Sequence, residues 1–180
     1  AGLAGTSFLS PEKLGFRYGS DHVNIVADAT VPKGLGSFGY DDEGVKAQCT
    51  PIITKGIFKN FISSRDTASV LNQPSNGTAR ADGWGKIAIV RMTNINLLPG
   101  DQELDQLIAG VENGLFLCTN KSWSIDDKRL NFQFACEIAF EIQNGKLSGK
   151  IYKNPIYTGI TPQFWNSCDG VASEKYWRLY

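Results

Sequence analysis

The fold is decided by FQFACEIAFEI, residues 132–142. Phe132, Phe134, Cys136, Ile138, Phe140 and Ile142 occupy every second position. Between them stand Gln133, Ala135, Glu137, Ala139 and Glu141. Because successive side chains of a β-strand point to opposite faces, this alternation predicts a strand with one buried face.

The residues that follow this strand predict a tight hairpin. Asn144-Gly145 stands between Gln143 and Lys146, and both central residues of a type I′ turn need a positive φ, which Asn and Gly tolerate. The return strand is predicted over 147–152 and ends before Asn154-Pro155. Two long antiparallel strands are therefore expected here.

A second hairpin is predicted nearer the amino terminus. Its strands are expected over 49–54 and 57–62, joined at Lys55-Gly56. Pro51 cannot donate a hydrogen bond to a neighbouring strand, so it indicates an edge position or the beginning of a strand.

The remaining pattern is also rich in strands. Apolar alternation predicts further strands over 21–28, 86–91 and 115–118. One main helix is predicted over about 101–112, with Asp101 as its N-cap and apolar residues at helical spacing. Shorter helical turns are expected at 66–71 and 162–168. Because strands and helices do not alternate, the fold class is α+β and β-rich, with a mostly antiparallel sheet or a barrel-like domain.

Size and composition favour one folded domain. The chain has 180 residues, of which 42% are hydrophobic and 20% charged, so we expect a single domain over 1–180. Basic and acidic residues balance at 18 each without a basic run, so no direct nucleic-acid partner is expected. No apolar stretch approaches the ~20 residues of a membrane span, so no membrane contact is expected either. The four cysteines have no C-x-x-C spacing, and reduced thiols are preferred over disulfides.

The sequence contains no readable catalytic motif. The single histidine, His22, cannot form a two-imidazole zinc site, and a structural role is preferred for it. We find no G-x-S-x-G, P-loop, dinucleotide or EF-hand pattern.

Four polar residues are candidates for a substrate cleft: Asp41, Asp42, Arg91 and Asn94. The acidic cluster 41–43 suits a hard cation, although a solvated turn that caps backbone N–H groups is the favoured interpretation. An Arg with a nearby Asn can hold peptide carbonyls or carboxylates, and the alternative is an internal salt bridge.

Other residues leave two further alternatives open. The Gly-rich loop 75–85 either lines a groove or is a plain surface loop. The aromatic residues either stack on sugars or pack in the core, and core packing is favoured because they show no regular spacing.

Taken together, several short segments resemble the carboxy-terminal region of the TldD/PmbA family, once described as modulators of DNA gyrase and now regarded as metallopeptidases. The order and spacing of the segments carry the resemblance over nearly the whole chain. They are Asp28-Ala29-Thr30, Gly36-Ser37, Asp41-Asp42-Glu43-Gly44, Ile53-Thr54-Lys55-Gly56-Ile57, Ser75-Asn76-Gly77 with Arg80, Arg91-Met92-Thr93-Asn94, Leu98-Pro99-Gly100, Gly114-Leu115, 132–134, Asn144-Gly145-Lys146 and Tyr157-Thr158-Gly159-Ile160.

The resemblance implies a cytoplasmic zinc peptidase that cleaves flexible peptides and pairs with a homologous subunit as a homo- or heterodimer. In that family a helical H-E-x-x-x-H segment before this region and a cysteine beyond it hold the metal. No metal ligand or catalytic residue is therefore assigned here, Cys168 included, and no cofactor is expected in this chain. We expect the chain to be an inactive fragment that supplies cleft walls and subunit contacts.

One departure from the family and two alternatives remain. Residues 119–126 replace a common Gly-rich stretch that is expected to border the cleft. A non-catalytic, peptide-binding partner subunit is the alternative function, and a carbohydrate-binding β domain is a third.

Overall fold

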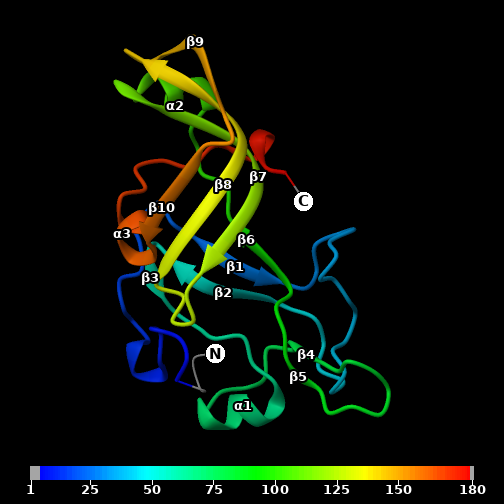
Figure 1. Cartoon of the computed structure of the whole chain (residues 1–180). Helices are drawn as coiled ribbons and strands as arrows, with labels where there is room; N and C mark the ends of the chain where they lie inside the picture. The colour runs from blue at the N-terminus through cyan, green and yellow to red at the C-terminus, as the bar shows by residue number, and fades with distance from the viewer. Residues whose placement is uncertain (1–4, 179–180) are drawn as a thin grey trace. The chain divides into compact units, whose positions relative to one another are not determined.

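The computed structural model describes residues 5–178, which form two compact units (Figure 1). We call residues 9–98 the loop-rich unit, and residues 5–8 and 99–178 the large-sheet unit. The strands are β1 (Ile25–Asp28), β2 (Cys49–Thr54), β3 (Ile57–Phe58), β4 (Ala79–Arg80), β5 (Ile89–Val90), β6 (Asn94–Leu97), β7 (Asn113–Ile125), β8 (Asn131–Gln143), β9 (Lys146–Lys153) and β10 (Ile156–Ile160). The helices are α1 (Arg65–Val70), α2 (Leu104–Ala109), α3 (Thr161–Asn166) and two 3₁₀ turns, η1 (Pro11–Lys13) and η2 (Glu174–Tyr176).

The loop-rich unit contains an open antiparallel sheet in the order β3-β2-β1-β6. The predicted turn between β2 and β3 is confirmed, because Lys55 and Gly56 have φ angles of 47° and 70°. A side chain at position 56 is excluded by the chain itself, since a Cβ there would lie 2.0 Å from the carbonyl oxygen of Gly19.

Pro51 lies in β2, which has a strand on each side. β3 pairs with β2 only at Ile53 and Thr54, so at Pro51 the sole strand neighbour is β1. The edge position predicted from Pro51 is therefore confirmed for that residue, although β2 as a whole is not an edge strand.

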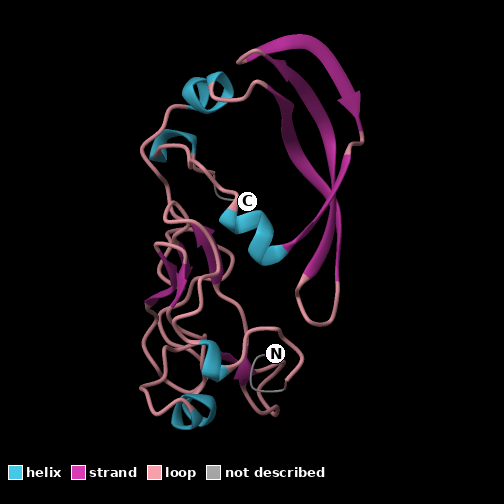
Figure 2. Ribbon diagram, turned by 90° about the vertical axis from the view of Figure 1, so that its left-hand side faces the viewer, coloured by secondary structure: helices cyan, strands magenta, loops and turns pink. Residues whose placement is uncertain are grey.

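The core of the loop-rich unit is small and apolar. Its buried hydrophobic residues are Val23, Val26, Ala27, Ala29, Ile53, Phe58, Ala68 and Ala79. A separate two-stranded ribbon, β4 with β5, is joined by the loop over 81–88, which extends away from the ribbon in Figure 1. Much of this unit is irregular chain, as the loops in Figure 2 show.

The large-sheet unit is built around the predicted strand, observed as β8. β7 pairs along one side of β8, while β10 and then β9 pair along the other. The predicted Asn-Gly hairpin is confirmed, since Asn144 and Gly145 have φ angles of 50° and 74° and Gln143 pairs with Lys146.

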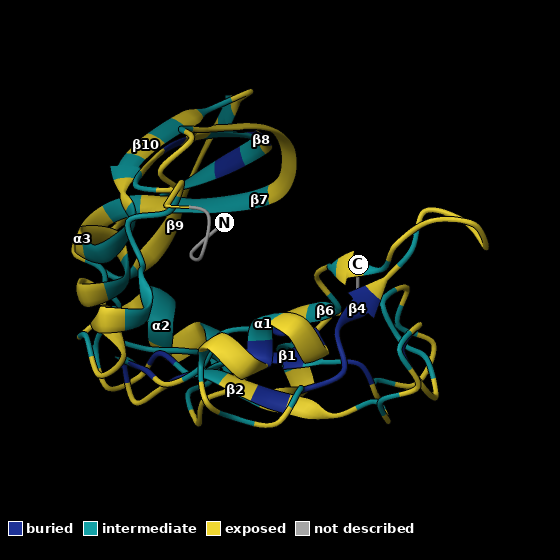
Figure 3. Ribbon diagram, turned by 90° about the horizontal axis from the view of Figure 1, so that it is seen from below, coloured by how far each residue is buried: buried dark blue, intermediate teal, exposed yellow. Residues whose placement is uncertain are grey.

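The expectation of one buried face on β8 is only partly right. Ala139 is fully buried although it lies on the face opposite Phe132 and Ile142, which are also buried. Figure 3 shows a dark blue, buried stretch on β8. Ala139 lies between Leu117 of β7 and Tyr152 of β9 in the same row, and these larger side chains flank its methyl group. The central position of β8 therefore buries residues on both faces.

The helix predicted over about 101–112 is shorter in the structure. Gly100 and Gln102 form parallel bridges with Ser173 and Ala172, so the backbone stays extended until the N-cap Glu103. The helix α2 ends at its C-cap Gly110. Tertiary pairing thus removed the first turn that the apolar spacing predicted.

The predicted fold class is confirmed. Both larger sheets are antiparallel and open, helices are few and short, and the helical turns predicted near 66–71 and 162–168 appear as α1 and α3. Among the described residues, no helix is long and apolar enough to cross a membrane. A single domain over 1–180 remains a prediction.

Candidate functional site

Asp41, the first predicted cleft residue, is buried, and its side chain forms hydrogen bonds with backbone N–H groups. Its carboxylate accepts hydrogen bonds from the N–H groups of Glu43, Val45 and Ala79, at 3.0, 2.8 and 3.0 Å. Its side chain and backbone are 7% exposed. A carboxylate saturated by backbone donors closes a turn and ties that turn to β4.

The other two acids of the cluster are used in the same way. Asp42 accepts the N–H of Ala81 at 2.7 Å, and Glu43 accepts the N–H of Arg65 at 2.7 Å, at the beginning of α1. The prediction that Asp41 or Asp42 caps backbone N–H groups is confirmed, and Glu43 does the same, but the expectation of a solvated turn is wrong for Asp41, which is buried.

Asn94 connects three segments of the loop-rich unit. Its side-chain oxygen accepts the N–H of Gly36 at 2.8 Å. Its amide nitrogen donates to the carbonyl of Asp28 at 2.7 Å and to Ser37 Oγ at 2.9 Å. A Cβ on Gly36 would lie 2.7 Å from the backbone carbon of Thr93, so glycine is required where this loop meets β6.

Arg91 has an exposed side chain. Its backbone N–H donates to the carbonyl of Thr78 at 2.9 Å, which continues the pairing of β4 with β5. Within residues 5–178 its guanidinium makes no ion pair, so the internal salt bridge to the acidic turn that the sequence suggested is not formed there. Arg91 is the one predicted cleft residue with a charged group left available.

The structure therefore separates the four predicted residues by role. Asp41, Asp42 and Arg91 border the β4–β5 ribbon, while Asn94 holds the loop over 34–37. Three of them use their polar atoms on backbone groups. Their role in a cleft stays a prediction.

A buried polar cluster adjoins this network. Asn76 accepts the N–H of Ser63 at 2.7 Å and donates to the carbonyl of Phe61 at 2.7 Å. The hydroxyl of Thr78 donates to the carbonyl of Ser63 at 3.0 Å. Part of the predicted flexible loop 75–85 is therefore fixed in the interior, because buried polar groups are stable only when they are paired.

Thr93 is an exception to this pairing. Among the described residues its hydroxyl is the one buried side-chain polar atom without a hydrogen-bond partner. It lies between Met92 and Asn94, next to the loop that Asn94 holds. Such an atom lowers stability unless water reaches it.

The described residues do not fit a zinc centre. No group of three or more His, Cys, Asp or Glu side chains is placed to hold a metal ion within residues 5–178. His22, the single histidine, is exposed, and the cysteines are free, as expected. Burial raises the pKa of the Cys118 thiol, which disfavours the thiolate that a metal requires.

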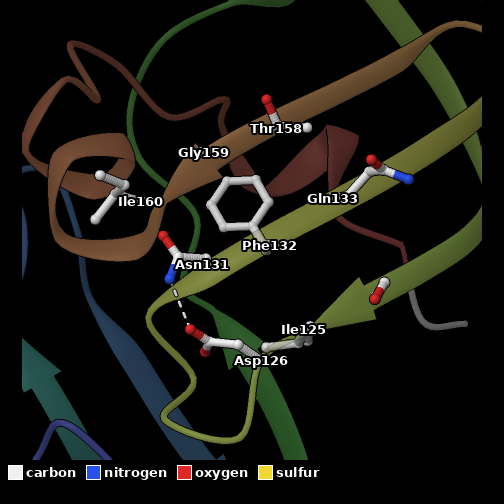
Figure 4. Close-up of a pocket in the computed structure, with 9 residues that line it drawn as sticks. Ile125, Asp126, Asn131, Phe132, Gln133, Thr158, Gly159 and Ile160 are labelled. Carbon is white, nitrogen blue, oxygen red and sulfur yellow. Dashed lines mark hydrogen bonds between the residues drawn. The ribbon is translucent and has the colours of Figure 1, made fainter.

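A shallow groove of about 500 Å³ lies at one end of the large sheet (Figure 4). Ser124, Gln133 and Thr158 lie in one row across β7, β8 and β10, because they are directly paired. Their side chains make no hydrogen bond to another described residue. Asp126 closes the groove's end, where it accepts hydrogen bonds from Asn131 at 2.6 Å and from the N–H of Leu130 at 2.7 Å.

Aromatic side chains pack on the opposite face of the sheet at this end. The ring of Phe132 lies against Gly159, where a Cβ would approach it to 2.6 Å (Figure 4). Phe132 stacks on Phe134 with ring centroids 5.0 Å apart and meets the edge of Phe164 at 5.4 Å. Because Phe132 and Gln133 are consecutive in β8, their side chains point to opposite faces of the sheet, so the polar row of Ser124, Gln133 and Thr158 lies on the face opposite this aromatic packing.

β7 borders this groove, and one of its two edges has no strand partner among residues 5–178. It pairs with β8, and no backbone group of 113–125 bonds to any other described segment. Natural edge strands are usually protected by charges, and Lys121 is the single charged residue of β7. A long strand with unpaired N–H and C=O groups is a template for an extended chain.

The middle of β7 is distorted. Thr119 has a φ of 58°, and the register with β8 shifts between Asn120 and Ser122, which makes Lys121 a bulge. Lys121 is fixed by Glu137 at 3.1 Å and by Asn154 at 2.8 Å. The stretch that departs from the family's Gly-rich sequence thus begins at a backbone conformation that favours glycine.

Site prediction from sequence missed Ser124, Gln133 and Thr158. For Ser124 the one available signal was the departure at 119–126, which the resemblance placed beside the cleft, and Gln133 and Thr158 had none. Isolated Ser, Gln and Thr residues in strands carry no motif, and pairing alone brings them into one row.

Known proteins resemble this chain in sequence and in structure. A metalloprotease from Methanocaldococcus jannaschii is 39% identical over 137 residues, which covers 76% of this chain and 30% of that protein. One from Methanothermobacter thermautotrophicus is 36% identical over 172 residues, 96% and 37% of the two chains. A protein named zinc metalloprotease TldD homolog, from Saccharolobus solfataricus, is 33% identical over 135 residues, 75% and 30% of the two chains. The chain thus spans about a third of the length of these curated relatives.

The fold also matches solved structures. A Thermotoga maritima protein whose name links it to modulation of a DNA gyrase has a TM-score of 0.80 at 22% identity, over 95% of this chain and 38% of that protein. TldE from Thermococcus kodakarensis has a TM-score of 0.74 at 21% identity, over 90% and 36% of the two chains. Residues 1–179 match the family model of the PmbA/TldA metallopeptidase C-terminal domain, and the chain therefore belongs to the TldD/PmbA family as its carboxy-terminal domain.

Proposed function

We propose that this chain is the peptide-holding part of a zinc metallopeptidase, in which the free edge of β7 binds an extended, flexible peptide. Relatives named metalloproteases support the class of reaction, and one of them is named a zinc metalloprotease. The observation that carries the proposal is the free edge of β7, which extends over Asn113–Ile125.

Strand addition explains how such a site accepts many sequences. A peptide laid along β7 would exchange main-chain hydrogen bonds with it, and these bonds are indifferent to side chains. The unpaired row of Ser124, Gln133 and Thr158 would add polar contacts at one end of the strand. Broad substrate choice with weak preferences at that end is the expected result.

The zinc and the catalytic residues belong, in this proposal, to parts of the parent protein outside the 180 residues. The described side chains do not form a metal centre, so no catalytic step is assigned to them. We expect the isolated chain to bind no stoichiometric zinc and to cleave no peptide, whereas the full-length parent does both. Tight zinc binding or hydrolysis by the 180-residue chain alone would contradict this division.

Peptides with methylated backbone nitrogens test strand addition. Binding of a fluorescent peptide to the full-length parent would be measured by anisotropy. Methyl groups on two alternate nitrogens that face β7 should weaken binding roughly 30-fold, since each lost hydrogen bond costs about 1 kcal/mol. The matched control carries methyl groups on the intervening nitrogens, which face away, and should bind like the unmodified peptide.

Two results would overturn the proposal. Equal effects of the two methylated peptides would show that no strand edge forms hydrogen bonds with the peptide backbone. Hydrogen exchange gives the location, because the bound peptide should protect amides within residues 113–125 but leave β6 unchanged. Protection of β6 alone would show that the peptide binds at the edge of β6 and not at β7.

The partner and the location of the parent are part of the same proposal. We propose a homologous subunit as its partner and the cytoplasm as its location, both on the strength of the family. The alternative, a non-catalytic partner subunit that also binds peptide, would pass the binding test but would not hydrolyse peptide in full-length form.

A further inference from the structure

Large apolar side chains are exposed around the β4–β5 ribbon of the loop-rich unit. At the tip of the ribbon, Trp84 is 104% exposed and Ile87 is 87% exposed. The set, which we call the ribbon patch, has members that are at least half exposed: Leu35, Tyr40, Trp84, Ile87, Ile89 and Met92. Scattered exposed apolar residues are ordinary, but such a set on neighbouring segments marks an interaction surface.

The members come from three segments that hydrogen bonds hold together. Asp41 and Asp42 accept the N–H groups of Ala79 and Ala81, which brings the segment of Tyr40 to the base of the ribbon. Asn94 accepts the N–H of Gly36, which brings the segment of Leu35 next to that of Met92. These hydrogen bonds hold the segments of Tyr40 and Leu35 at the base of the ribbon before anything binds, and a preorganised surface binds with a smaller loss of entropy.

The composition of the ribbon patch favours a permanent neighbour. The exposed charged residues Asp82, Lys86 and Arg91 alternate with these apolar residues along the ribbon, and apolar side chains with polar residues around them are the usual composition of a protein interface. Tryptophan is also the residue most typical of the centre of such interfaces. A fully exposed indole is therefore better explained by an occupant that stays in place.

The comparisons indicate where this neighbour comes from. The chain covers 30% and 37% of its archaeal relatives and 38% of a solved structure of the same fold, so most of such a protein lies outside these 180 residues. We infer that the ribbon patch is the surface against which the remaining part of the same parent chain packs. This inference rests on residues of the loop-rich unit alone and does not depend on peptide binding at β7.

Hydroxyl-radical footprinting of the full-length parent tests the inference. Trp84 and Met92 are readily oxidised, and mass spectrometry measures the oxidation rate of each. Both should react roughly tenfold more slowly than in the urea-unfolded protein, because a buried indole is removed from solvent. This protection should persist on dilution and without peptide.

Three outcomes would overturn the inference. Fast oxidation at every concentration would mean that nothing covers the ribbon patch. Protection lost on dilution would identify a second subunit as the occupant, and protection that appears only with added peptide would identify a substrate.

A pair of variants provides a second measurement. In the full-length parent, Trp84→Ser with Ile87→Ser should lower the unfolding midpoint and expose Met92 to oxidation. The matched control is Val70→Ser, at a 70% exposed position on α1 of the same unit, which should change neither. Equal behaviour of the two variants would contradict the inference, and the wild-type footprint decides it even if the double variant does not fold.

Discussion

The two units of this chain are stabilised by different means. In the loop-rich unit, short strands are connected by irregular chain that buried polar side chains hold, above all Asp41, Asn76 and Asn94. In the large-sheet unit, β7 and β8 pair over 13 residues each, and aromatic rings cluster around Phe132.

The difference shows two ways to satisfy backbone groups. A long strand pairs its N–H and C=O groups with a neighbouring strand, and its side chains remain free for packing. Irregular chain has no such neighbouring strand, so side-chain carboxylates and amides must accept the hydrogen bonds of its individual N–H groups. Individual polar side chains therefore contribute much of the stability of the loop-rich unit. In the large sheet, burial of apolar surface contributes most of it.

The largest expected effect is at the aromatic cluster. Phe132→Ala should lower the free energy of unfolding by about 3–5 kcal/mol, because it removes a buried ring and leaves a cavity against Gly159. Urea unfolding measures the change. Trp123→Ala, at a position 67% exposed in β7, is the control and should cost far less.

Asp41 is the matching test in the loop-rich unit. Asp41→Ala leaves three backbone N–H groups unpaired and should cost about 3 kcal/mol. Asp42→Ala removes a single exposed hydrogen bond, so its unfolding midpoint should stay near that of the wild type. If both variants unfold alike, the view that buried polar groups stabilise this unit is wrong.

Two threonines test the same explanation, that paired buried polar groups stabilise the loop-rich unit. Thr93→Val replaces a buried hydroxyl that has no partner and should raise stability by about 1 kcal/mol. Thr78→Val removes a hydroxyl bonded to the carbonyl of Ser63 and should lower stability by a similar amount. Thermal melts of the two variants should therefore shift in opposite directions.

Thr119 tests whether the large sheet also contains strain. Its φ of 58° is costly for a residue with a branched Cβ, so Thr119→Gly should gain up to about 1 kcal/mol, less the entropy that glycine loses on folding. Thr119→Ala keeps a Cβ and should gain little. A loss of stability in the glycine variant would show that the conformation is unstrained.

The smallest effect concerns pH. Hydrogen bonds from Lys175 and Tyr176 lower the pKa of Glu103 below its ordinary value of 4.5. This carboxylate therefore adds stability that is present above its unfolded pKa and is lost as the pH falls through the lower, folded value. Glu103→Gln should reduce the loss of stability between neutral pH and about pH 3, measured by urea unfolding at each pH. An unchanged pH profile would assign that loss to other groups.

Several features were predictable from sequence because their causes are local. Alternation over 132–142 indicated β8, and Asn144-Gly145 and Lys55-Gly56 indicated the two turns. Such turns require positive φ at adjacent residues, which only a few residue types tolerate, so a dipeptide suffices. The ordered set of short segments likewise identified the family over nearly the whole chain.

Other features depended on neighbours distant in sequence. β7 is far longer than the predicted 115–118, because β8 offers a partner along its whole length to residues that have no apolar alternation. The beginning of α2 depended on the pairing of Gly100 and Gln102 with the carboxy-terminal segment. The burial of Ala139 depended on larger side chains in the adjacent strands.

The candidate sites divide in the same way. The sequence by itself determined the fold class, the turns and the family, since these rest on periodicity, backbone preference and the order of motifs. Only the tertiary structure decided that Asp41 accepts hydrogen bonds from the backbone, that Ser124, Gln133 and Thr158 form one row, and that one edge of β7 has no partner in the described part of the chain. Those facts depend on which strands pair and in which register, and register follows from the packing of the whole sheet rather than from any single segment.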